Sequence, residues 1–417
     1  MMQKFIEAEY EITNFENKAD VYVINTCTVT SIADKKSRQM IRRVKQQNKN
    51  AIVVAVGCYV QVAKEKLEEI EDIDLILGTK EKKDIVKYVS EYMKNREKIV
   101  SVSEMNLKDN YEEYGLITHT ERNRAVIKIE DGCNQFCTYC IIPYARGRVR
   151  SRKPENIISE IEKISENGIK EVVLTGINLT AYGTDIDYTL IELLEGINRI
   201  PKIQRIRLGS LEPTIITEEF VKRLSKLEKV CDHFHLSLQS GCTETLKRMN
   251  RKYTAKEIEE AAKTIRKYYK NAALTADIIV GFPGETKEEF NQTYELLNRI
   301  KLYKIHVFKY SPRKGTRAAV MENQIDGNIK EERSNKLLEL SDKYEKEFNN
   351  SCIGKTLSVL FEEQDGKYVK GHTSNYRLVK VNLEKNSEGF EIEKIENEIL
   401  NVKIIGAEGL ELIGEFC

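Results

Sequence analysis

The chain has 417 residues, of which 67 are Lys or Arg and 66 are Asp or Glu, so its formal net charge is +1 and excludes a globally basic nucleic-acid-binding protein. It has no run of about 18 apolar residues and no secretory signal at Met1, which predicts a cytoplasmic protein without membrane contact. The length favours roughly two to four domains, and 9 cysteines, clustered in part, indicate metal binding in a reducing compartment rather than disulfides.

The first hundred residues alternate between two kinds of pattern. Residues 21–25, 51–57 and 74–78 are short apolar runs rich in β-branched side chains, typical of strands that are buried on both faces. Amphipathic stretches between them predict helices. Residues 1–100 are therefore predicted to form a small parallel α/β domain.

Two cysteines stand just past these predicted strands. Cys27 follows the first strand and Cys58 follows the second. Because ligand-binding groups converge at the carboxyl edge of open α/β sheets, the pair is a candidate metal site. From these two residues alone, buried free cysteines that act as small hydrophobic side chains remain the alternative.

After a polar stretch at residues 101–124, read as a linker, strand and helix patterns alternate six times. The predicted strands are residues 125–130, 171–177, 205–210, 233–238, 274–282 and 304–311. Six such units predict an open, partial (β/α)6 barrel rather than the closed form with eight strands. With the long charged helix predicted at residues 327–350, this domain spans residues 119–350.

The C-terminal residues 351–417 read as short alternating strands, at 356–362, 367–372 and 377–381. This pattern predicts a small β-barrel. The fold class is therefore α/β, with a parallel N-terminal domain, a partial barrel and a C-terminal β-barrel.

The loop after the first barrel strand carries the most specific signal. Cys133, Cys137 and Cys140 are spaced CxxxCxxC, so three thiols on one tight loop could hold three irons of a 4Fe–4S cluster and leave the fourth iron open. An open iron is what a cluster needs to bind S-adenosylmethionine and to split it reductively. A zinc site would want a fourth nearby ligand, and no His or Cys follows within ninety residues. The loop predicts a radical enzyme.

The whole chain resembles the radical-SAM methylthiotransferases, which join an N-terminal cluster domain, a partial radical-SAM barrel and a C-terminal TRAM domain. The triple-cysteine loop is specific to the superfamily, and the N-terminal cysteines with a TRAM-like tail are specific to the methylthiotransferases. Within that family the chain is most similar to the MtaB-type branch, which methylthiolates N6-threonylcarbamoyladenosine at position 37 of tRNA. The matching segments are residues 25–30, 35–39, 132–147, 174–178, 238–241 and 281–286.

The resemblance implies two 4Fe–4S clusters and two uses of S-adenosylmethionine. One molecule methylates a sulfur on an auxiliary cluster at Cys27 and Cys58, and a second is cleaved at the loop cluster to a 5′-deoxyadenosyl radical. That radical removes the hydrogen from C2 of the adenine, and the methylthio group is transferred to this carbon. The family holds its auxiliary cluster with three cysteines. Here Met1 begins inside what looks like the helix after the first cysteine, so we expect that strand and that ligand to be absent from this chain, either because the start codon is placed too late or because the protein is truncated.

Five further residues follow or line the predicted barrel strands and are candidates to bind S-adenosylmethionine. In each case direct contact competes with a simple role in a turn or in packing. They are Asn178, Ser210, Glu212, Gln239 and Asp277. His233 and His235, also on a strand, read as core or supporting residues rather than as bases.

RNA contact requires a local basic surface. Arg146 and Arg148 border the cysteine loop, and the C-terminal module offers Lys367, Lys370 and Arg377, although residues 351–417 hold 8 Lys and Arg against 12 Asp and Glu. These five residues are the predicted RNA contacts. The expected partners are tRNA and an electron donor such as a flavodoxin or ferredoxin, with the enzyme a monomer.

Three other functions stay open from the sequence. The acceptor could be isopentenyladenosine at position 37 of tRNA, or an aspartate of a ribosomal protein, as in sister branches of the family. The third alternative is a catalytically silent RNA-binding protein, which the absent N-terminal cysteine makes conceivable.

Overall fold

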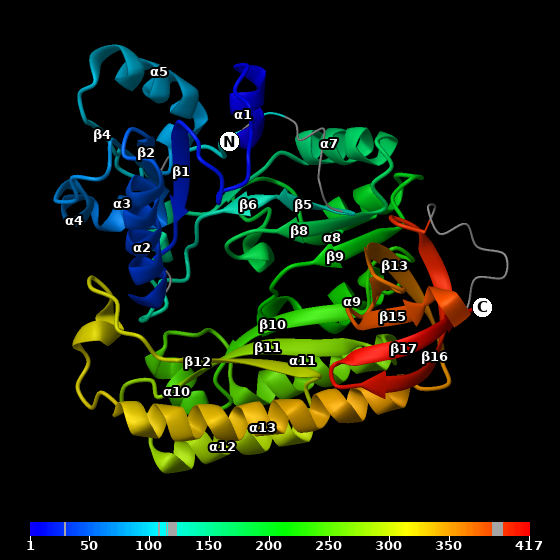
Figure 1. The fold of residues 1–417 in the computed structure, drawn as a ribbon. Coiled ribbons are helices and arrows are strands. Elements are labelled where there is room, and N and C mark those ends of the chain that lie inside the picture. Colours follow the sequence, from blue (N-terminus) through cyan, green and yellow to red (C-terminus); the bar gives the residue numbers. More distant parts are fainter. Residues whose placement is uncertain (29–30, 107–108, 114, 116–122, 386–394) are drawn as a thin grey trace. The chain divides into compact units, whose positions relative to one another are not determined.

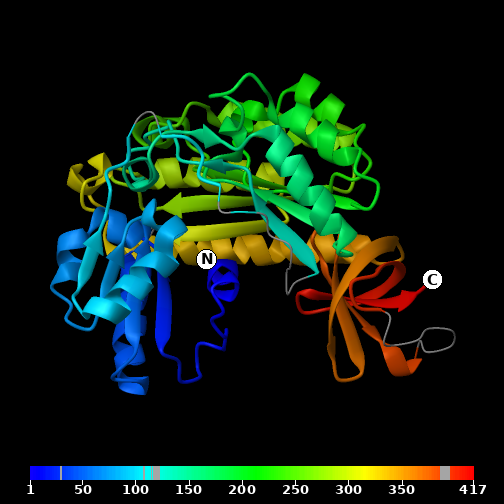
Figure 2. The same cartoon turned by 90° about the horizontal axis from the view of Figure 1, so that it is seen from above.

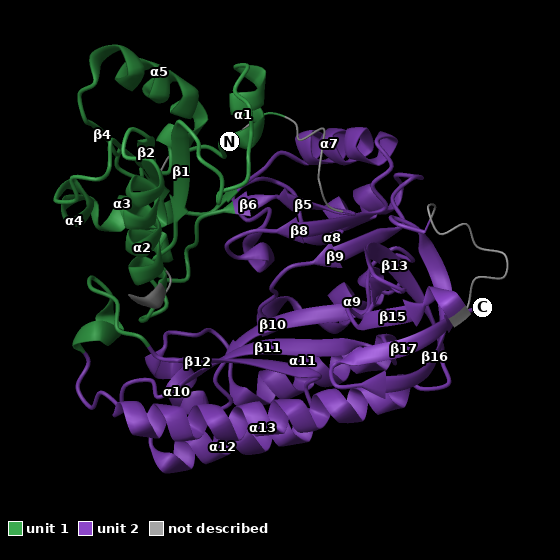
Figure 3. Ribbon diagram, viewed as in Figure 1, with its two compact units in different colours: residues 1–116, 131–150, 311–320 green, residues 117–130, 151–310, 321–417 purple. Residues whose placement is uncertain are grey.

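The computed structural model describes residues 1–28, 31–106, 109–113, 115, 123–385 and 395–417. The chain divides into two compact units (Figure 3). Unit 1 holds residues 1–116, 131–150 and 311–320, and unit 2 holds residues 117–130, 151–310 and 321–417. No described helix has the length and apolar character needed to cross a membrane.

Unit 1 is built on a four-stranded parallel sheet in the order β1-β2-β3-β4 (Figure 1). Its strands are β1 (Val21–Thr26), β2 (Ile52–Gly57), β3 (Leu75–Leu77) and β4 (Ile99–Ser101). Every residue of β2 is buried, as expected for an inner strand of a sheet that is covered on both faces. The predicted parallel α/β fold of this region is confirmed.

The helices of unit 1 complete two separate cores. Adjacent strand residues point to opposite faces, so Val53 packs with Ile24 and Ile41, whereas Val54 packs with Leu75 and Val89. The helices are α1 (Met2–Glu7), α2 (Ser31–Gln47), α3 (Cys58–Val62), α4 (Lys64–Glu68), α5 (Ile85–Asn95) and α6 (Ile142–Arg146). The predicted linker, residues 101–124, lies partly outside the described residues.

Unit 2 contains the predicted open barrel of six parallel strands. They form two three-stranded sheets, β5-β8-β9 and β10-β11-β12, and bridges at Ile206–Val230 and Leu211–Leu236 connect the second half to the first. The strands are β5 (Arg124–Lys128), β8 (Glu171–Thr175), β9 (Arg205–Leu208), β10 (His233–Gln239), β11 (Ala273–Val280) and β12 (Lys304–Lys309). Two short strands, β6 (Glu130–Asp131) and β7 (Arg150–Ser151), pair with each other.

Helices cover the outer face of this barrel and meet a core of Leu and Ile side chains. Three of them begin at a capping box, in which Thr189, Thr254 and Thr286 each exchange hydrogen bonds with a Glu three residues later. The helices are α7 (Pro154–Glu166), α8 (Leu190–Asn198), α9 (Glu218–Leu224), α10 (Thr243–Arg248), α11 (Ala255–Tyr268), α12 (Lys287–Ile300) and α13 (Gly327–Cys352).

The long helix α13 runs along β12 and ends at the C-terminal module (Figure 2). That module is a small closed barrel in the order β13-β14-β15-β17-β16, and only its β15–β17 pair is parallel. Its strands are β13 (Thr356–Asp365), β14 (Tyr368–Thr373), β15 (Leu378–Asn382), β16 (Ile399–Glu408) and β17 (Glu411–Phe416). The predicted C-terminal β-barrel is confirmed, and the predicted domain limits at 1–100, 119–350 and 351–417 stay a prediction.

A buried charge cluster joins the partial barrel to the C-terminal barrel within unit 2. Glu171 is fully buried and accepts from Arg207 Nε at 2.8 Å and from Arg205 Nη1 at 3.4 Å. Arg205 also donates to the backbone carbonyls of Ser358 and His372 in the C-terminal barrel. Burial alone would raise the pKa of Glu171, but Arg207 and its neighbouring guanidinium groups hold that pKa below its ordinary value.

Replacement of Glu171 by Gln is expected to lower the free energy of unfolding by about 3–5 kcal/mol, because it leaves buried arginines without their counter-charge. Urea unfolding measures this change, with Glu218→Gln on an exposed surface as the control. Since the folded pKa of Glu171 is lowered, its contribution is complete above the unfolded carboxyl pKa and is lost as pH falls through the folded value. Equal losses in the two variants would contradict the assigned role.

Candidate functional site

Two cysteines of unit 1 lie side by side at the carboxyl edge of its sheet. Thr26 and Gly57 are Cα partners in the parallel pair β1–β2, and Cys27 and Cys58 are the residues that follow them. Cys27 is exposed and Cys58 is buried. Both cysteines therefore follow adjacent strand ends, where the sequence predicts them.

The CxxxCxxC loop, residues 133–140, is called the radical loop because the sequence predicts radical chemistry there. It closes on itself in the same unit. The backbone N–H of Cys133 donates to the Gly147 carbonyl at 3.0 Å, and the N–H of Cys140 donates to the Cys137 carbonyl at 2.9 Å. Cys133 Sγ accepts from the N–H of Gln135 at 3.4 Å. The loop is thereby fixed at its base and within its turn, with Cys133 and Cys137 buried and Cys140 half-buried.

Gly132 allows this closure. Its φ is +86°, and a Cβ at this position would lie 1.9 Å from the carbonyl oxygen of Arg148. We expect Gly132→Ala to destabilise the protein by about 1–3 kcal/mol more than a glycine replacement with backbone strain alone, because the added methyl group cannot fit.

The matched control is Gly354→Ala, since Gly354 has a φ of +84° and no atom lies within 4 Å of its added Cβ. Thermal and urea unfolding of the two variants measure the difference. If Gly132→Ala lowered the free energy of unfolding no more than Gly354→Ala does, the close contact between Gly132 and the carbonyl of Arg148 would be refuted.

Arg146 connects the two cysteine sites inside unit 1. It lies at the end of α6, just after the CxxxCxxC loop, and its Nε donates to Cys58 Sγ at 3.1 Å. Asp131, just before the loop, pairs with Arg146 Nη1 and with Arg150 Nη2, each at 3.4 Å. One guanidinium therefore links the start of the radical loop to a thiol of the sheet edge.

A segment between β12 and α13 also belongs to unit 1 and contacts both cysteine loops. Arg313 donates to Thr28 Oγ1 and to Asp34 Oδ2, the latter at 2.8 Å. The N–H of Ala318 donates to the Thr138 carbonyl at 2.8 Å. Thr28 directly follows one sheet-edge cysteine and Thr138 directly follows a cysteine of the radical loop. Sequence patterns did not predict the role of Arg313, because it lies 285 positions from Thr28.

The donor set of the radical loop fits an iron–sulfur cluster. Among the described residues, no three or more His, Cys, Asp or Glu side chains are grouped as ligands of one metal ion. A cluster does not need such a group, because each thiolate binds a different iron. Three thiols on one closed loop, with a backbone N–H aimed at one sulfur, have the chemistry that such a cluster takes.

In unit 2, two of the five predicted cofactor-binding residues meet. Asn178 Nδ2 donates to Glu212 Oε1 at 3.4 Å, and both residues are buried. The N–H of Asn178 donates to Glu130 Oε2 at 2.8 Å, and Arg251 pairs with Glu212 at 3.1 Å. Sequence reasoning found neither Glu130 nor Arg251 as a partner. Their contacts fix the orientation of the predicted pair.

The other three predicted residues are spread over three strand ends. Ser210 is exposed after β9. Gln239 ends β10 at a register shift and has a left-handed φ of +66°, an uncommon conformation for a residue other than glycine. Asp277 on β11 lies 3.3 Å from His235 Nε2 and is the Cα partner of His306 on β12.

His235 thus supports Asp277, as its predicted supporting role implies. His233 is buried, and burial lowers its pKa to about 3, with Arg207 contributing in the same direction. It is therefore neutral at physiological pH and stacks on Tyr376 with ring centroids 5.3 Å apart. Both observations agree with a packing role for His233.

The predicted RNA contacts occupy very different environments. The guanidinium of Arg148 lies 4.4 Å from the ring centroid of Phe136, which in turn meets the exposed Tyr144 edge to face. In the C-terminal barrel, Lys370 pairs with Asp365 at 2.8 Å and Lys367 lies 3.6 Å from a Glu384 oxygen. The three residues Arg148, Phe136 and Tyr144 at the loop and the two lysines remain accessible to a ligand.

The predicted RNA contact at Arg377 requires correction. Arg377 is only 2% exposed, its guanidinium lies 4.3 Å from the Tyr303 ring centroid, and its Nη1 is 3.4 Å from Glu345 Oε1. It fastens the C-terminal barrel to β12 and α13 within unit 2. Strand alternation puts Arg377 in phase with the buried Val379 and Val381, so its charge alone suggested an exposed position.

The chain matches two protein families. Residues 127–297 match the Radical SAM superfamily, and residues 1–78 match the Uncharacterized protein family UPF0004. It is 42% identical over 384 residues to the threonylcarbamoyladenosine tRNA methylthiotransferase MtaB of Bacillus subtilis, covering 90% of this chain and 85% of that protein. The chain belongs to the radical-SAM methylthiotransferases.

Other members of this methylthiotransferase family are also similar over most of the chain. MtaB of Aquifex aeolicus is 42% identical over 365 residues, covering 88% of this chain and 89% of that protein. The tRNA-2-methylthio-N(6)-dimethylallyladenosine synthase of Clostridium botulinum is 36% identical over 417 residues, covering 97% and 90%. The radical-SAM methylthiotransferase reaction uses a 4Fe–4S cluster and S-adenosylmethionine as cofactors.

The fold also agrees with that of a solved radical enzyme. The radical S-adenosylmethionine methyltransferase TsrM of Kitasatospora setae superposes with a TM-score of 0.55 at 17% identity, covering 76% of this chain and 68% of that one. At this identity the match concerns the fold alone. It agrees with the open six-stranded barrel of this methylthiotransferase.

Proposed function

We propose that this chain transfers a methylthio group to C2 of N6-threonylcarbamoyladenosine at position 37 of tRNAs. The observation that carries the proposal is the 42% identity to MtaB enzymes of two different bacteria, over 90% and 88% of the chain. Because the substrate is tRNA, we propose that the enzyme works in the cytoplasm. We also propose that a flavodoxin or ferredoxin is its electron donor and that it works as a monomer.

The radical loop would hold the cluster that binds S-adenosylmethionine, through Cys133, Cys137 and Cys140. When bound, this cluster would pass one electron from the external donor to S-adenosylmethionine, and the cleavage would supply the radical that removes the hydrogen from C2. The residues of this chain orient the three thiols. The backbone hydrogen bonds of Cys133 and Cys140 hold the loop, and the turn at Gly132 closes it. Burial of Cys133 and Cys137 limits the access of water to that site.

The five residues of unit 2 are proposed to bind S-adenosylmethionine. Asn178 and Glu212 are held by Glu130 and Arg251, so their polar atoms are fixed before a ligand arrives. Asp277 is oriented by its contact with His235. Gln239 and Ser210 add polar atoms from neighbouring strand ends. All five belong to carboxyl ends or inner faces of barrel strands, where barrels of this kind carry their chemistry.

Cys27 and Cys58 are proposed ligands of the auxiliary 4Fe–4S cluster. Their adjacency at the sheet edge and the Arg146 contact to Cys58 support this assignment. A hydrogen bond to a ligating sulfur is one of the means by which proteins tune such clusters. The chain would thereby tune the auxiliary cluster through Arg146, a residue that follows the radical loop.

For RNA we propose Arg148 beside the radical loop, together with Lys367 and Lys370 of the C-terminal barrel. Arg146 is a weaker candidate than the sequence indicated, because its guanidinium is occupied by Cys58 and Asp131. Phe136 and the exposed Tyr144 add aromatic surface next to Arg148, a combination that binds unpaired bases. We retain a TRAM-like RNA-binding role for the C-terminal barrel within this proposal.

The second candidate is methylthiolation of dimethylallyladenosine, since the Clostridium botulinum synthase is 36% identical over 97% of this chain. An assay with defined acceptors distinguishes the two. Purified, anaerobically reconstituted protein is incubated with anticodon stem-loops that carry either threonylcarbamoyl or dimethylallyl adenosine, and nucleosides are analysed by mass spectrometry. A mass gain of one methylthio group on the threonylcarbamoyl acceptor alone is expected. Product only on the dimethylallyl acceptor would assign the second candidate.

A further inference from the structure

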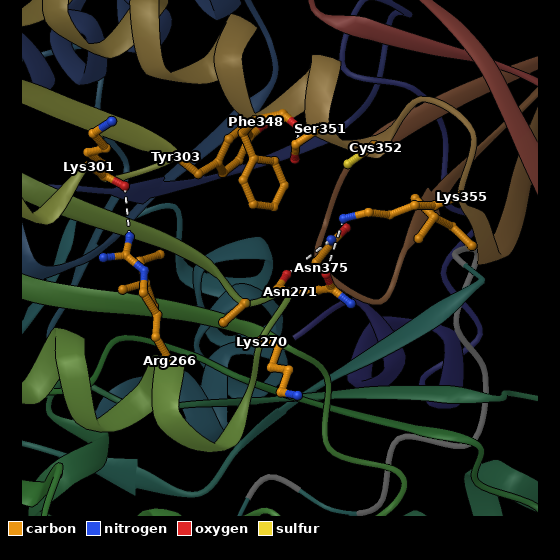
Figure 4. A pocket seen from close by; sticks show the side chains of 13 residues that line it. Arg266, Lys270, Asn271, Lys301, Tyr303, Phe348, Ser351, Cys352, Lys355 and Asn375 are labelled. Atoms are coloured by element: carbon orange, nitrogen blue, oxygen red, sulfur yellow. Dashed lines mark hydrogen bonds between the residues drawn. The ribbon is translucent and has the colours of Figure 1, made fainter.

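A pocket of unit 2 lies outside the cysteine loops and the proposed cofactor residues. It has a volume of about 230 Å³ and is enclosed by the end of α11 and the loop after it, the residues around the start of β12, the end of α13 and the C-terminal barrel (Figure 4). It thus opens where the amino ends of β11 and β12 meet the C-terminal barrel. The proposed cofactor residues lie farther along the barrel strands.

The lining of this pocket is basic. It includes Arg266, Lys270, Lys301 and Lys355, and no Asp or Glu is among the lining residues. Within the described residues, only Lys301 has a carboxylate nearby, at 3.8 Å from Glu347. The Lys301 ammonium points away from the cavity, toward Glu347 and the Tyr344 ring (Figure 4), so three cations remain around the cavity, and they favour an anionic ligand.

Neutral oxygen atoms hold two of these cations in place. Arg266 Nη2 donates to the backbone carbonyl of Lys301 at 2.8 Å, and Lys355 Nζ donates to Asn271 Oδ1 at 3.2 Å. Burial lowers the pKa of Arg266, and no neighbouring acid offsets this effect. Glu345, which accepts a hydrogen bond from the lining residue Tyr303 at 3.2 Å, is engaged by its own pair with Lys304 at 2.5 Å. The positive charge of the pocket is therefore not neutralised by the protein itself.

The remaining walls suit a planar ring. Tyr303 and the half-buried Phe348 lie with ring centroids 5.1 Å apart, and both face the pocket (Figure 4). Asn271 and Asn375 bring side-chain amides, which both donate and accept hydrogen bonds. Aromatic rings beside amides and cations form the set of groups that binds a nucleobase together with its phosphate.

We propose that this pocket binds a single phosphate-bearing nucleotide. The phosphate meets Lys355, Arg266 and Lys270 add positive charge from other walls of the pocket (Figure 4), and the base lies against Phe348. The volume is below the roughly 300–1,000 Å³ of pockets for drug-sized ligands, which limits the occupant to one nucleotide unit. The nucleotide is either a free mononucleotide or one residue of an RNA strand, and the site does not depend on the proposed methylthiolation.

The test uses the whole chain and two probes, adenosine monophosphate in calorimetry and a fluorescent single-stranded RNA in anisotropy. Adenosine without phosphate is the ligand control. The double variant Lys270→Gln with Lys355→Gln changes two exposed residues of the lining, so folding should be intact, as a thermal unfolding scan checks. Lys346→Gln, on the exposed side of α13 and outside the lining, is the matched control.

We expect the double variant to bind a phosphate-bearing probe about tenfold or more weakly, because charge-assisted hydrogen bonds to phosphate are lost. Weaker binding of adenosine monophosphate, with adenosine unaffected, supports the site and identifies a free nucleotide as its ligand. Weaker binding of RNA alone supports the site with RNA as the source. The proposal is overturned if each probe binds the double variant as tightly as it binds Lys346→Gln. It is also overturned if neither probe binds the unchanged protein.

Discussion

Cys137→Ala is expected to abolish the production of 5′-deoxyadenosine from S-adenosylmethionine. Cys137 is buried in the closed radical loop and is the middle thiol of the three. Its loss leaves one iron without a thiolate, and changes outside the ligand shell already cost about 10–100-fold in metal affinity or activity, so we expect a loss of more than about 100-fold. Chromatography of anaerobic reactions with dithionite as the reductant measures the product.

The control is Cys417→Ser, because Cys417 is exposed at the end of the C-terminal barrel. It should cleave S-adenosylmethionine at the rate of the unchanged protein and bind the same amount of iron. Undiminished 5′-deoxyadenosine from Cys137→Ala would refute the ligand assignment of the radical loop.

Cys58→Ala separates the two cysteine sites. If Cys58 serves the auxiliary cluster, this variant should still form 5′-deoxyadenosine, because radical formation depends on the other loop. It should nevertheless give no methylthiolated nucleoside, since the sulfur to be transferred is not held. Both products, 5′-deoxyadenosine and the methylthiolated nucleoside, are measured in the same reaction with a tRNA acceptor. A variant that still forms the methylthio product at the original yield would remove Cys58 from the mechanism.

Local sequence patterns predicted the positions of the cysteines well. The strands before Cys27 and Cys58 begin with apolar, β-branched residues, and such runs identify parallel strands and hence the edge where they end, although only β2 is buried along its whole length and β1 alternates. The spacing of Cys133, Cys137 and Cys140 likewise defines a loop by itself. Each of these inferences depends on neighbours in the chain, which is why the sequence alone sufficed.

Contacts between distant segments could not be predicted in the same way. Arg146 and Cys58 are 88 positions apart, and Arg313 and Asp34 are 279 apart, so no local pattern connects them. Without aligned relatives, nothing in one sequence marks such pairs. The four segments that enclose the basic pocket present the same difficulty, because the pocket exists only after the C-terminal barrel has folded onto α13.

Arg377 shows how residue type can mislead where the alternating pattern does not. It directly precedes β15 and is in phase with the buried Val379 and Val381, so the alternation puts it on the inward face, and only its charge suggested a solvated face. In the fold, Glu345 and the Tyr303 ring receive its guanidinium, and the residue is buried with its charge paired. The alternation gives the two faces of a strand, whereas docking of another element decides which face meets solvent.

The central claim is that the acceptor is N6-threonylcarbamoyladenosine in tRNA. It is tested most directly by mass spectrometry of tRNA nucleosides from a strain that lacks this gene, with and without the gene restored. We predict loss of 2-methylthio-N6-threonylcarbamoyladenosine, accumulation of its unmethylthiolated precursor, and recovery by the unchanged protein but not by Cys137→Ala. An intact threonylcarbamoyl product, with loss of the methylthiolated dimethylallyl nucleoside instead, would contradict the claim.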